Sequence, residues 1–500
     1  MDYTKKLPQE NERLEYKHSK SVFPKDAWET VSSFQNTKGG LLILGISEND
    51  KHQFNIEGVK NVQGVLDSFW AGINDELLCS FNGVTNDDIT TTLTHSKTII
   101  EINIPRAPNS KLPVHMRNNI MNTYIRNGAV DAKASEDQIY SLKRMAERNN
   151  DTHVLKNYDI DDLDMNSIHD YKNLLIKRKR YSFYKDYSTN KFLKTIGVLS
   201  KDYENDGKIG LTEAGLLFFG KNNAIIHKFP NFQLEYYDKS FPEQDRWTSR
   251  ISSVESDLNI FSFYKKVEEI LIAKTPGPFK LNKDGQRIDT MESMKVALRE
   301  ALINMLMHAD YLGNSPLIIN NYSNHYEFLN PGEMLIPEND FFTTTKTATR
   351  NPTISKLFVQ IGLGERAGQG GETIFESAQS TDLKQPEIKT DLNGTQLKIW
   401  KVDYADSISG EKISERERKI LKAINNNGSM PLSRREIIKK TKLSASITTR
   451  CINSLLTKKL IIRVGKSSAT KYGLPISSKQ IFAQLQTMPD IFRKMLNKNN

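Results

Sequence analysis

The stretch of residues 297–311, ALREALINMLMHADY, constrains the fold of this chain more than any other. Apolar residues recur in it at helical spacing and neither Gly nor Pro interrupts them, so the stretch predicts a helix. Glu300, Asn304 and His308 lie four residues apart, so three polar side chains share one stripe of an otherwise apolar helix. The stripe is either a solvated face or a nucleotide site, in which a carboxylate orients water and an amide oxygen holds the magnesium that bridges phosphates.

Length and composition describe a multidomain protein of a reducing compartment. The 500 residues exceed the size at which a single core keeps growing, which argues for about three domains. No uninterrupted apolar run approaches the roughly 20 residues of a membrane helix, and the N-terminus lacks the apolar core of a secretory signal. Only Cys79 and Cys451 are present, so neither a disulfide framework nor a cysteine-based metal site is expected. We therefore expect a cytoplasmic protein without a membrane partner.

The first 149 residues predict one module. Residues 13–17 alternate like a strand with one buried face. A helix follows Pro24 and stops at the turn of residues 36–40, which ends in two glycines. Residues 41–46 have the continuous apolar character of a central strand, and an acidic turn follows.

These motifs resemble the Schlafen/AlbA-type domain. The resemblance rests on Leu-Glu-Tyr-Lys at residues 14–17, the turn that ends in Gly-Gly, the Leu-Gly-Ile strand, and Tyr-Ile-Arg-Asn-Gly at residues 124–128. The domain name implies nucleic-acid binding, for which Lys17 and Arg126 are the candidate contacts within these motifs. The fold alone does not decide function.

Carboxylates in the same module raise the possibility of nuclease chemistry. Schlafens with nuclease activity use two Glu residues five apart and a third acidic residue after the Gly-Gly strand. Glu10 and Glu15 have this spacing, and Glu48 or Asp50 stands where the third is expected. Such carboxylates hold a divalent metal, Mg²⁺ or Mn²⁺, beside a scissile phosphate and activate water. The alternatives are that Glu12 competes for this place, or that Glu15 simply forms an ion pair with a base.

The middle of the chain contains a short basic cluster. The net charge of +10 and the pI of about 9.1 permit nucleic-acid binding without establishing it. Three aromatic residues follow the cluster within four positions, which combines phosphate-binding charge with rings that stack on bases; a solvated helix end is the alternative. The candidate contacts are Lys177, Arg178, Lys179 and Arg180.

The Glu-x-x-x-Asn pattern of the opening helix resembles the N-box of GHKL ATPases. In that family the Glu is the general base and the Asn binds magnesium, which assigns these roles to Glu300 and Asn304. The longer string, ending in His-Ala-Asp-Tyr, is similar to the divergent GHKL-like domain of bacterial proteins that carry an N-terminal Schlafen/AlbA-type domain. Asn330 is the nearest counterpart of the Asp that reads the adenine amino group, and its amide accepts that hydrogen bond without a charge.

Later motifs follow in the order that a GHKL domain requires. Residues 343–352 are polar enough for a lid over phosphates, and glycines near residue 370 precede a predicted helix, where backbone amides approach phosphate oxygens. A Gly-Thr pair then opens a strand, as at the end of GHKL domains. With ATP and Mg²⁺ as the expected ligands, the candidate contacts are Asn304, Asn330, Gly332, Lys346, Arg350, Gly368, Gly370, Gly371 and Thr395.

The carboxy-terminal residues 411–475 predict a winged helix-turn-helix. Capping-box patterns open helices after Ser414 and Ser433, a third helix follows Ser444, and two short strands flank a Gly-Lys-Ser-Ser turn. Such modules bind DNA or dock proteins. The candidate contacts are Thr448, Thr449, Arg450 and Lys466.

The sequence therefore predicts an α+β multidomain protein. Its expected parts are a Schlafen/AlbA-type domain (1–149), a connecting region (150–290), a GHKL-like α/β sandwich (291–405), a winged helix (411–475) and a helical tail (476–500). We expect a homo-oligomer that binds nucleic acid, DNA or RNA, in which nucleotide state changes the arrangement of two nucleic-acid-contacting ends. The alternative is a Schlafen-like nuclease, acting in phage defence, with the GHKL-like domain as its gate.

Overall fold

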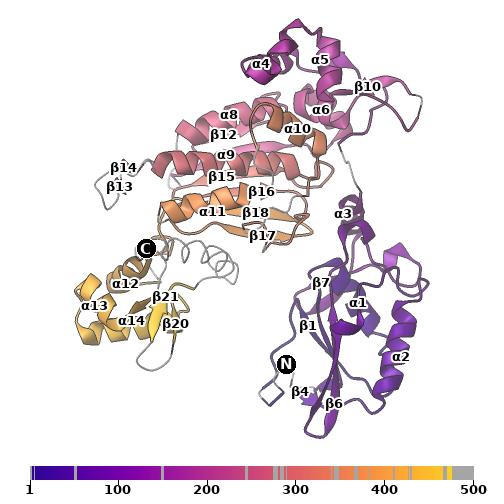
Figure 1. Cartoon of the computed structure of the whole chain (residues 1–500), viewed down its shortest axis with the longest axis vertical. Coiled ribbons are helices and arrows are strands. Elements are labelled where there is room, and N and C mark those ends of the chain that lie inside the picture. Colours follow the sequence, from indigo (N-terminus) through magenta and orange to yellow (C-terminus); the bar gives the residue numbers. More distant parts are fainter. Residues whose placement is uncertain are drawn as a thin grey trace, which may run out of the picture. The chain divides into compact units, whose positions relative to one another are not determined.

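A computed structural model gives the structure of the chain (Figure 1). It describes residues 3–4, 6–49, 53–147, 151–205, 207–241, 246–273, 280–281, 287–288, 290–338, 340–342, 348–364, 370–381, 383–408, 412–425, 427, 431–465 and 470–475. Internal contacts divide the chain into two units, Met1–Arg148 and Asn149–Asn500, and each is described separately below. Within the described residues, the helices are all too short or too polar to cross a membrane.

Unit 1 is built on a four-stranded sheet of order β1-β2-β6-β5, in which β1 runs parallel to β2 and the other pairs are antiparallel. Its strands are β1 (Leu14–Lys17), β2 (Gly40–Leu44), β5 (Ile89–Thr94) and β6 (Lys97–Ile104). Two further pairs are β3 (Ile46–Glu48) with β4 (Phe54–Ile56), and β7 (Tyr124–Asn127) with β8 (Val130–Lys133). The helices are α1 (Ala27–Asn36), α2 (Val62–Ile73) and α3 (Glu136–Ala146).

Glycines determine where the second strand begins and ends. Gly39 has φ +69°, and a Cβ there would lie 2.8 Å from the Ile104 carbonyl oxygen, so the turn after α1 requires glycine. Gly45 has φ +100° and interrupts the predicted strand of residues 41–46, which the structure divides into β2 and β3. The chain thereby leaves the main sheet and forms a separate two-stranded pair.

Helix α1 buries polar as well as apolar side chains. Asn36 donates from Nδ2 to the carbonyl oxygens of Val114 (2.7 Å) and Tyr124 (3.0 Å), and its Oδ1 accepts the Val114 N–H at 2.7 Å. Buried polar groups need such partners. Asn36, at the end of α1, therefore holds the segment around Val114 and the start of β7 together.

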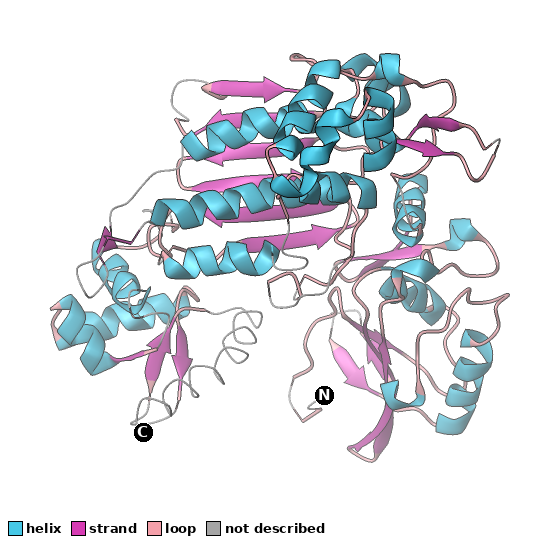
Figure 2. Ribbon diagram, turned by 45° about the horizontal axis from the view of Figure 1, so that its top comes forward, coloured by secondary structure: helices cyan, strands magenta, loops and turns pink. Residues whose placement is uncertain are grey.

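Unit 2 contains a six-stranded sheet of order β12-β11-β15-β16-β18-β17, in which only the β11/β15 pair is parallel among the described strands. The strands are β11 (Leu234–Lys239), β12 (Ser249–Ser252), β15 (Leu317–Tyr322), β16 (His325–Asn330), β17 (Glu387–Asp391) and β18 (Gly394–Trp400). Figure 2 shows helices lying over one face of this sheet. They are α8 (Ile260–Ala273), α9 (Thr290–His308) and α11 (Gly370–Ser380), with α10 (Pro352–Gln360) beside them.

The predicted limit at residue 291 cuts through this sheet. Strands β11 and β12 and helix α8 precede it, yet they share one hydrophobic core with α9. The region before them joins the same core, because the buried Tyr171 donates from its hydroxyl to the Leu357 carbonyl oxygen at 2.7 Å. This region comprises α4 (Met165–Ile176), a 3₁₀ helix η5 (Lys179–Asp186), α5 (Thr189–Ile196), β9 (Leu199–Lys201), β10 (Ile209–Leu211), α6 (Glu213–Phe219) and α7 (Asn222–Lys228). A short 3₁₀ helix, η4 (Ile160–Asp162), precedes α4, and a short pair of strands, β13 (Lys280–Leu281) and β14 (Arg287–Ile288), lies before α9.

The C-terminal part of unit 2 has its own small core. Three helices, α12 (Glu415–Asn425), α13 (Arg434–Thr441) and α14 (Ala445–Thr457), accompany a sheet of order β19-β21-β20, made of β19 (Leu432–Ser433), β20 (Ile462–Val464) and β21 (Lys471–Gly473). Helices α12 and α13 begin at the two predicted capping boxes, since Ser414 and Ser433 exchange hydrogen bonds with Glu417 and Glu436. The predicted tail of residues 476–500 lies outside the described residues.

Candidate functional site

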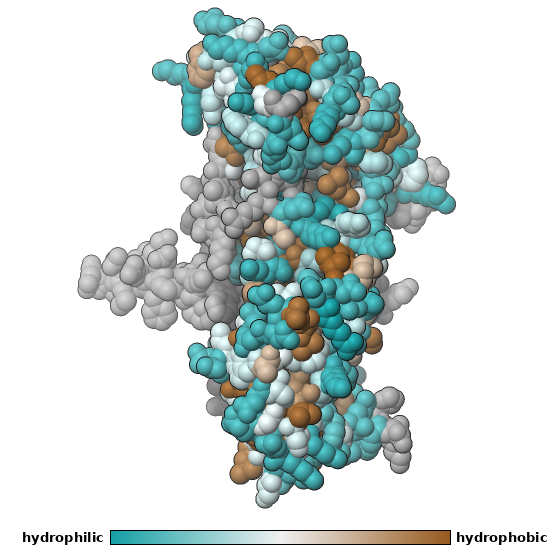
Figure 3. Space-filling view, turned by 90° about the vertical axis from the view of Figure 1, so that its right-hand side faces the viewer, coloured by the Kyte–Doolittle hydropathy of each residue, from teal (hydrophilic) through white to brown (hydrophobic). Residues whose placement is uncertain are grey.

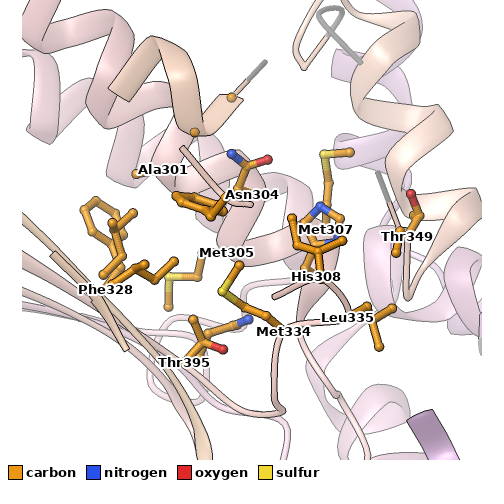
Figure 4. Close-up of a pocket in the computed structure, with 18 of the residues that line it drawn as sticks. Ala301, Asn304, Met305, Met307, His308, Phe328, Met334, Leu335, Thr349 and Thr395 are labelled. Carbon is orange, nitrogen blue, oxygen red and sulfur yellow. The ribbon is translucent and has the colours of Figure 1, made fainter. Parts of the chain in front are cut away.

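A pocket of about 280 Å³ opens between helix α9 and the strands β16 and β18. Figure 4 shows Asn304 and His308 on the helix and Phe328 and Thr395 on the strands around the same space. The first turn of α11, residues of α10 and the turn after β16 complete its walls. The pocket thus lies where the helical layer meets one end of the sheet.

The polar stripe of α9 faces this pocket. Glu300, Asn304 and His308 are partly exposed and line it, whereas most residues between them are buried in the core. The Asn304 Nδ2 donates to Glu300 Oε1 at 3.4 Å. The helix ends at His308, three residues before the end of the predicted stretch. The stripe therefore forms part of a pocket wall, and its role in nucleotide binding stays a prediction.

Glycines bring the start of α11 against this stripe. A Cβ on Gly370 would lie 2.4 Å from Glu300 Oε1 and 2.5 Å from Asn304 Nδ2, and a Cβ on Gly371 would lie 1.8 Å from the Phe341 carbonyl oxygen. Only glycine fits at such distances. The first backbone amides of an eleven-residue helix therefore adjoin the Glu/Asn pair, an arrangement suited to anions.

Asn330 ends β16 and presents an unused acceptor to the pocket. Its Oδ1 is buried and has no hydrogen-bond partner among the residues that the structure describes. The surrounding surface is apolar, formed by Met305, Phe328, Met334 and Leu397. A buried acceptor without a donor costs free energy, so the site is suited to a flat ligand that supplies an N–H group.

The turn after Asn330 is held in a defined shape. Gly332 has φ +92°, and a Cβ there would lie 2.9 Å from Asp310 Cβ. Thr395 donates from Oγ1 to the Gly332 carbonyl oxygen at 3.0 Å, and its backbone pairs with Asn330 across the sheet. Gly332 and Thr395 therefore shape the pocket, which both also line.

His308, to which the sequence assigned no role, lines the pocket as a neutral side chain. Burial, together with the smaller effect of the positive charge of Arg350, lowers the pKa of its imidazole to about 4. At neutral pH the ring therefore acts as a hydrogen-bonding group without charge.

The position of Arg350 does not agree with its predicted role as a phosphate contact in a lid. Its side chain is almost fully buried, with Nη2 donating to the Glu333 carbonyl oxygen at 2.7 Å and Nη1 lying 3.7 Å from Asp310 Oδ2. It does not line the pocket. This arginine supports the loop behind the site instead of contacting phosphate. The other predicted contacts in these loops, Lys346 and Gly368, lie outside the described residues.

Two of the predicted carboxylates of unit 1, Glu10 and Glu15, lie near Arg126. Glu10, Glu15 and Glu48 are neighbours, since burial and the charges of the other two raise the pKa of Glu10. Glu15, however, accepts from Arg126 Nη2 at 2.7 Å and lies 3.1 Å from Lys17 Nζ. Among the described residues, no three His, Cys, Asp or Glu side chains are arranged to hold a metal ion. Asp50 lies outside the described residues, and the nuclease alternative stays a prediction.

Two predicted nucleic-acid contacts of unit 1 are ion-paired within the fold. Arg126 is buried between Glu15 and Asp131, whose Oδ1 lies 2.8 Å from Nη1. Lys17 is paired with Asp26 at 3.0 Å as well as with Glu15. Their charges are neutralised locally, so both residues stabilise the domain and neither presents a free cation to phosphate.

In the C-terminal helix α14, the predicted nucleic-acid contact Thr448 is also inaccessible. Thr448 is fully buried and donates from Oγ1 to the Ser444 carbonyl oxygen at 2.9 Å, so it cannot reach a base. Thr449 is half-buried and Arg450 is exposed. Lys466 lies outside the described residues.

The basic cluster at the start of η5 is largely exposed. Lys177, Lys179 and Arg180 face solvent, whereas Arg178 packs closely over Gly362 in the loop after α10. Three of the four predicted contacts therefore remain available to a ligand.

Sequence reasoning missed the apolar floor of the pocket. Phe328 precedes Asn330 by two residues and Leu397 follows Thr395 by two, so each points to the same face of its strand as the predicted residue. Strand periodicity would have identified both. Ser355 and Val359 on α10 also line the pocket, and no local signal marks them.

A sheet covered by helices on one face, with a Glu/Asn helix facing a glycine-bounded pocket, defines a GHKL-like fold. Residues 10–135 match the family model of Schlafen, AlbA_2, and residues 314–399 match that of the putative ATP-dependent DNA helicase recG C-terminal. Residues 141–235 match a domain of unknown function (DUF8451). The chain therefore contains a Schlafen/AlbA-type domain and a divergent GHKL-like domain.

Two solved structures resemble the chain at low identity. The DIP2311 protein from Corynebacterium diphtheriae is 14% identical, with 93% of this chain and 95% of that chain covered and a TM-score of 0.38. The N-terminal domain of the putative ATP-dependent DNA helicase RecG-related protein from Nitrosomonas europaea is 21% identical, with 25% of this chain and 85% of that chain covered and a TM-score of 0.20. A search of curated proteins gave no match.

Proposed function

We propose that this chain is a nucleic-acid-binding regulator that binds ATP with Mg²⁺ in the α9 pocket. The two matched families support the general class, because one is Schlafen/AlbA and the other is named for a DNA helicase. The observation that carries the proposal is the position of Gly370, which brings a helix N-terminus within contact of Glu300 and Asn304. Phosphate, metal and water sites then share one wall of the pocket.

The residues of the pocket fit a magnesium nucleotide. The amides of Gly370 and Gly371 would face phosphate oxygens, and the Asn304 amide oxygen would coordinate magnesium, because its nitrogen already donates to Glu300. Glu300 would orient water. The buried Oδ1 of Asn330 would accept from the amino group of adenine above the apolar floor. When bound, Mg²⁺ would supply positive charge that offsets the negative charge of the phosphates.

The charge of the chain is concentrated away from the Schlafen/AlbA unit. Residues 1–148 carry eighteen Lys and Arg against nineteen Asp and Glu, whereas residues 411–475 carry sixteen against four. Basic side chains on α13, α14 and the hairpin face solvent, among them Arg434, Lys439, Arg450, Arg463 and Lys471. We therefore interpret the C-terminal part as a winged helix that contacts DNA through α14 and its hairpin.

A direct connection links the pocket to this module. Strand β18, which carries Thr395, ends at Trp400. Shortly after it, Tyr404, Ala405 and Ile408 pack into the C-terminal core. Arg418 of α12 donates to the Ala405 carbonyl oxygen at 2.7 Å and pairs with Asp406 at 3.1 Å. A shift of β18 on nucleotide binding would therefore move the attachment of the C-terminal module.

The test measures duplex DNA binding by fluorescence anisotropy with and without ATP and Mg²⁺. We expect ATP to change the affinity of the wild-type chain, and to leave that of Gly370→Ala unchanged because its pocket is filled. Equal ATP effects on both proteins, or none on the wild type under conditions in which ATP binds, would overturn the coupling. Gel analysis of the same samples reports any cleavage, the outcome that would favour the nuclease alternative.

A further inference from the structure

Residues 177–194 form the second concentration of positive charge in the chain. This segment contains seven Lys and Arg and a single acidic residue, Asp186. It begins directly after α4 and covers the helix η5 and most of α5, and it lies within the match to the domain of unknown function. We call it the aromatic–basic surface, because four aromatic side chains of residues 181–187 are interleaved with the cations.

The aromatic rings form a cluster with one buried member. Tyr184 is buried, and Tyr181 stacks on it with ring centroids 5.8 Å apart and an angle of 11° between the planes. Phe183 and Tyr187 contact the same ring at 4.5 and 5.5 Å. Phe183 nevertheless keeps 47% of its surface exposed. The packing therefore fixes these rings in place while Phe183 remains open to a ligand.

Cations already accompany two of the outer rings. The Arg180 guanidinium lies 5.3 Å from the centroid of Tyr181, and Lys191 Nζ lies 3.9 Å from that of Tyr187. No such cation–π contact to Phe183 occurs among the described residues. Phe183 is therefore the ring best placed to stack on a planar group, with Lys179 and Lys185 exposed beside it. At the top of Figure 3, in the part of unit 2 that contains α5 and β10, small patches of apolar side chains lie among hydrophilic ones.

We infer that the aromatic–basic surface binds single-stranded nucleic acid, with Phe183 stacked on a base and the flanking cations on phosphates. Exposed rings next to cations match a chain of alternating bases and phosphates. A duplex offers the charge but hides its base faces, and η5, with eight residues, is short for a groove-reading helix. An acidic peptide offers charge without planar rings. This surface is separate from the nucleotide pocket and from the C-terminal module of the proposed function.

The experiment measures binding of the full chain to three fluorescent probes of equal length: oligo-dT, oligo-rU and an abasic deoxyribose-phosphate strand. Phe183→Ala should weaken binding to the two base-containing strands by about 5- to 100-fold and leave binding to the abasic strand unchanged. Phe183→Tyr should restore the affinity, because it keeps the ring. Comparison of oligo-dT with oligo-rU identifies which sugar the surface prefers.

The matched control is Tyr203→Ala. Tyr203 is 83% exposed with Lys201 Nζ 5.5 Å from its ring, but it lies outside the aromatic cluster. Its substitution should leave every affinity unchanged. The pair Lys179→Ala and Lys185→Ala should reduce the slope of log affinity against log salt by about 1.4, since each single-strand phosphate contact contributes about 0.7.

A second readout does not depend on comparing affinities. Phe183→Trp places an indole at the stacking position, and its emission should be quenched by oligo-dT and not by the abasic strand. The inference is overturned if Phe183→Ala binds all strands like the wild type, or if the abasic strand binds as tightly as oligo-dT. Loss of duplex binding in parallel with single-strand binding would also overturn it. If duplex binding is weakened by Arg450→Ala and not by Phe183→Ala, the duplex binds the C-terminal module, and this inference is unaffected.

Discussion

The substitution Gly370→Ala tests the pocket most sharply, because a single methyl group meets both members of the Glu/Asn pair. The new Cβ would lie 2.4 Å from Glu300 Oε1 and 2.5 Å from Asn304 Nδ2. Ordinary contacts are about 3.5 Å, so both side chains must move by about 1 Å. The methyl group also occupies the space in front of the first amides of α11. Nucleotide binding should therefore be lost while the fold survives.

The expected stability change is small because two effects oppose each other. Overpacking costs about 1–3 kcal/mol, whereas Ala is favoured over Gly in a helix by at most about 1 kcal/mol. The free energy of unfolding should thus fall by roughly 0–2 kcal/mol. The effect on the ligand is larger. At 100 times its dissociation constant, ATP stabilises the wild type by about 2.7 kcal/mol, and a 100-fold weaker affinity reduces this to about 0.4 kcal/mol.

The assay is thermal unfolding of the full chain with and without ATP and Mg²⁺. For a domain of this size, ATP and Mg²⁺ should raise the Tm of the wild type by about 5–10 °C. The Tm of Gly370→Ala should change little. Glu376→Ala, exposed on the same helix, is the control and should keep the full shift. A variant that folds and shows the wild-type shift would refute the placement of the nucleotide beside Gly370.

Three further predictions concern other residues. Arg126→Ala leaves two carboxylates buried without their cation, so hydrogen exchange in α1 should show that the free energy of unfolding falls by about 3–5 kcal/mol. The control is Lys38→Ala, which removes an exposed ion pair and should change this free energy by less than about 1 kcal/mol. The pKa of His308 is about 4 in the folded chain and 6.5 in the unfolded chain, so the unfolded state binds the proton more tightly. The free energy of unfolding should therefore decrease as pH falls from about 6.5 towards 4, by about 2 kcal/mol at pH 5. Thermal scans of His308→Gln across pH should lack this decrease. Arg450→Ala should weaken duplex binding and lower its salt dependence in anisotropy titrations, whereas Thr448→Val, a change at a buried position, should leave both unchanged.

The parts of the site that the sequence predicted are those carried by local patterns. The spacing of Glu300 and Asn304 placed both on one helix face, and the structure puts that face in the pocket. Gly370 and Thr395 were identified by motif order alone. The error at Thr448 was avoidable, because it shares a helix face with Cys451, Ile452 and Leu455, all buried.

Other features depend on partners far away in the chain. Arg126 and Glu15 are 111 residues apart, and Arg350 is buried by its contacts with Asp310 and Glu333. Nothing near either arginine in the sequence predicts that its charge is neutralised. The sheet extends across the predicted domain limit for the same reason, since β11 pairs with β15 across a separation that contains two helices.

Isothermal titration calorimetry of the wild-type chain with ATP tests the central claim most directly. In the presence of Mg²⁺ we expect one site per chain, with binding weakened when the metal is chelated and weakened by Asn304→Ala only while Mg²⁺ is present. Absence of binding by the folded wild type, or binding that neither Gly370→Ala nor Asn304→Ala alters, would contradict the account.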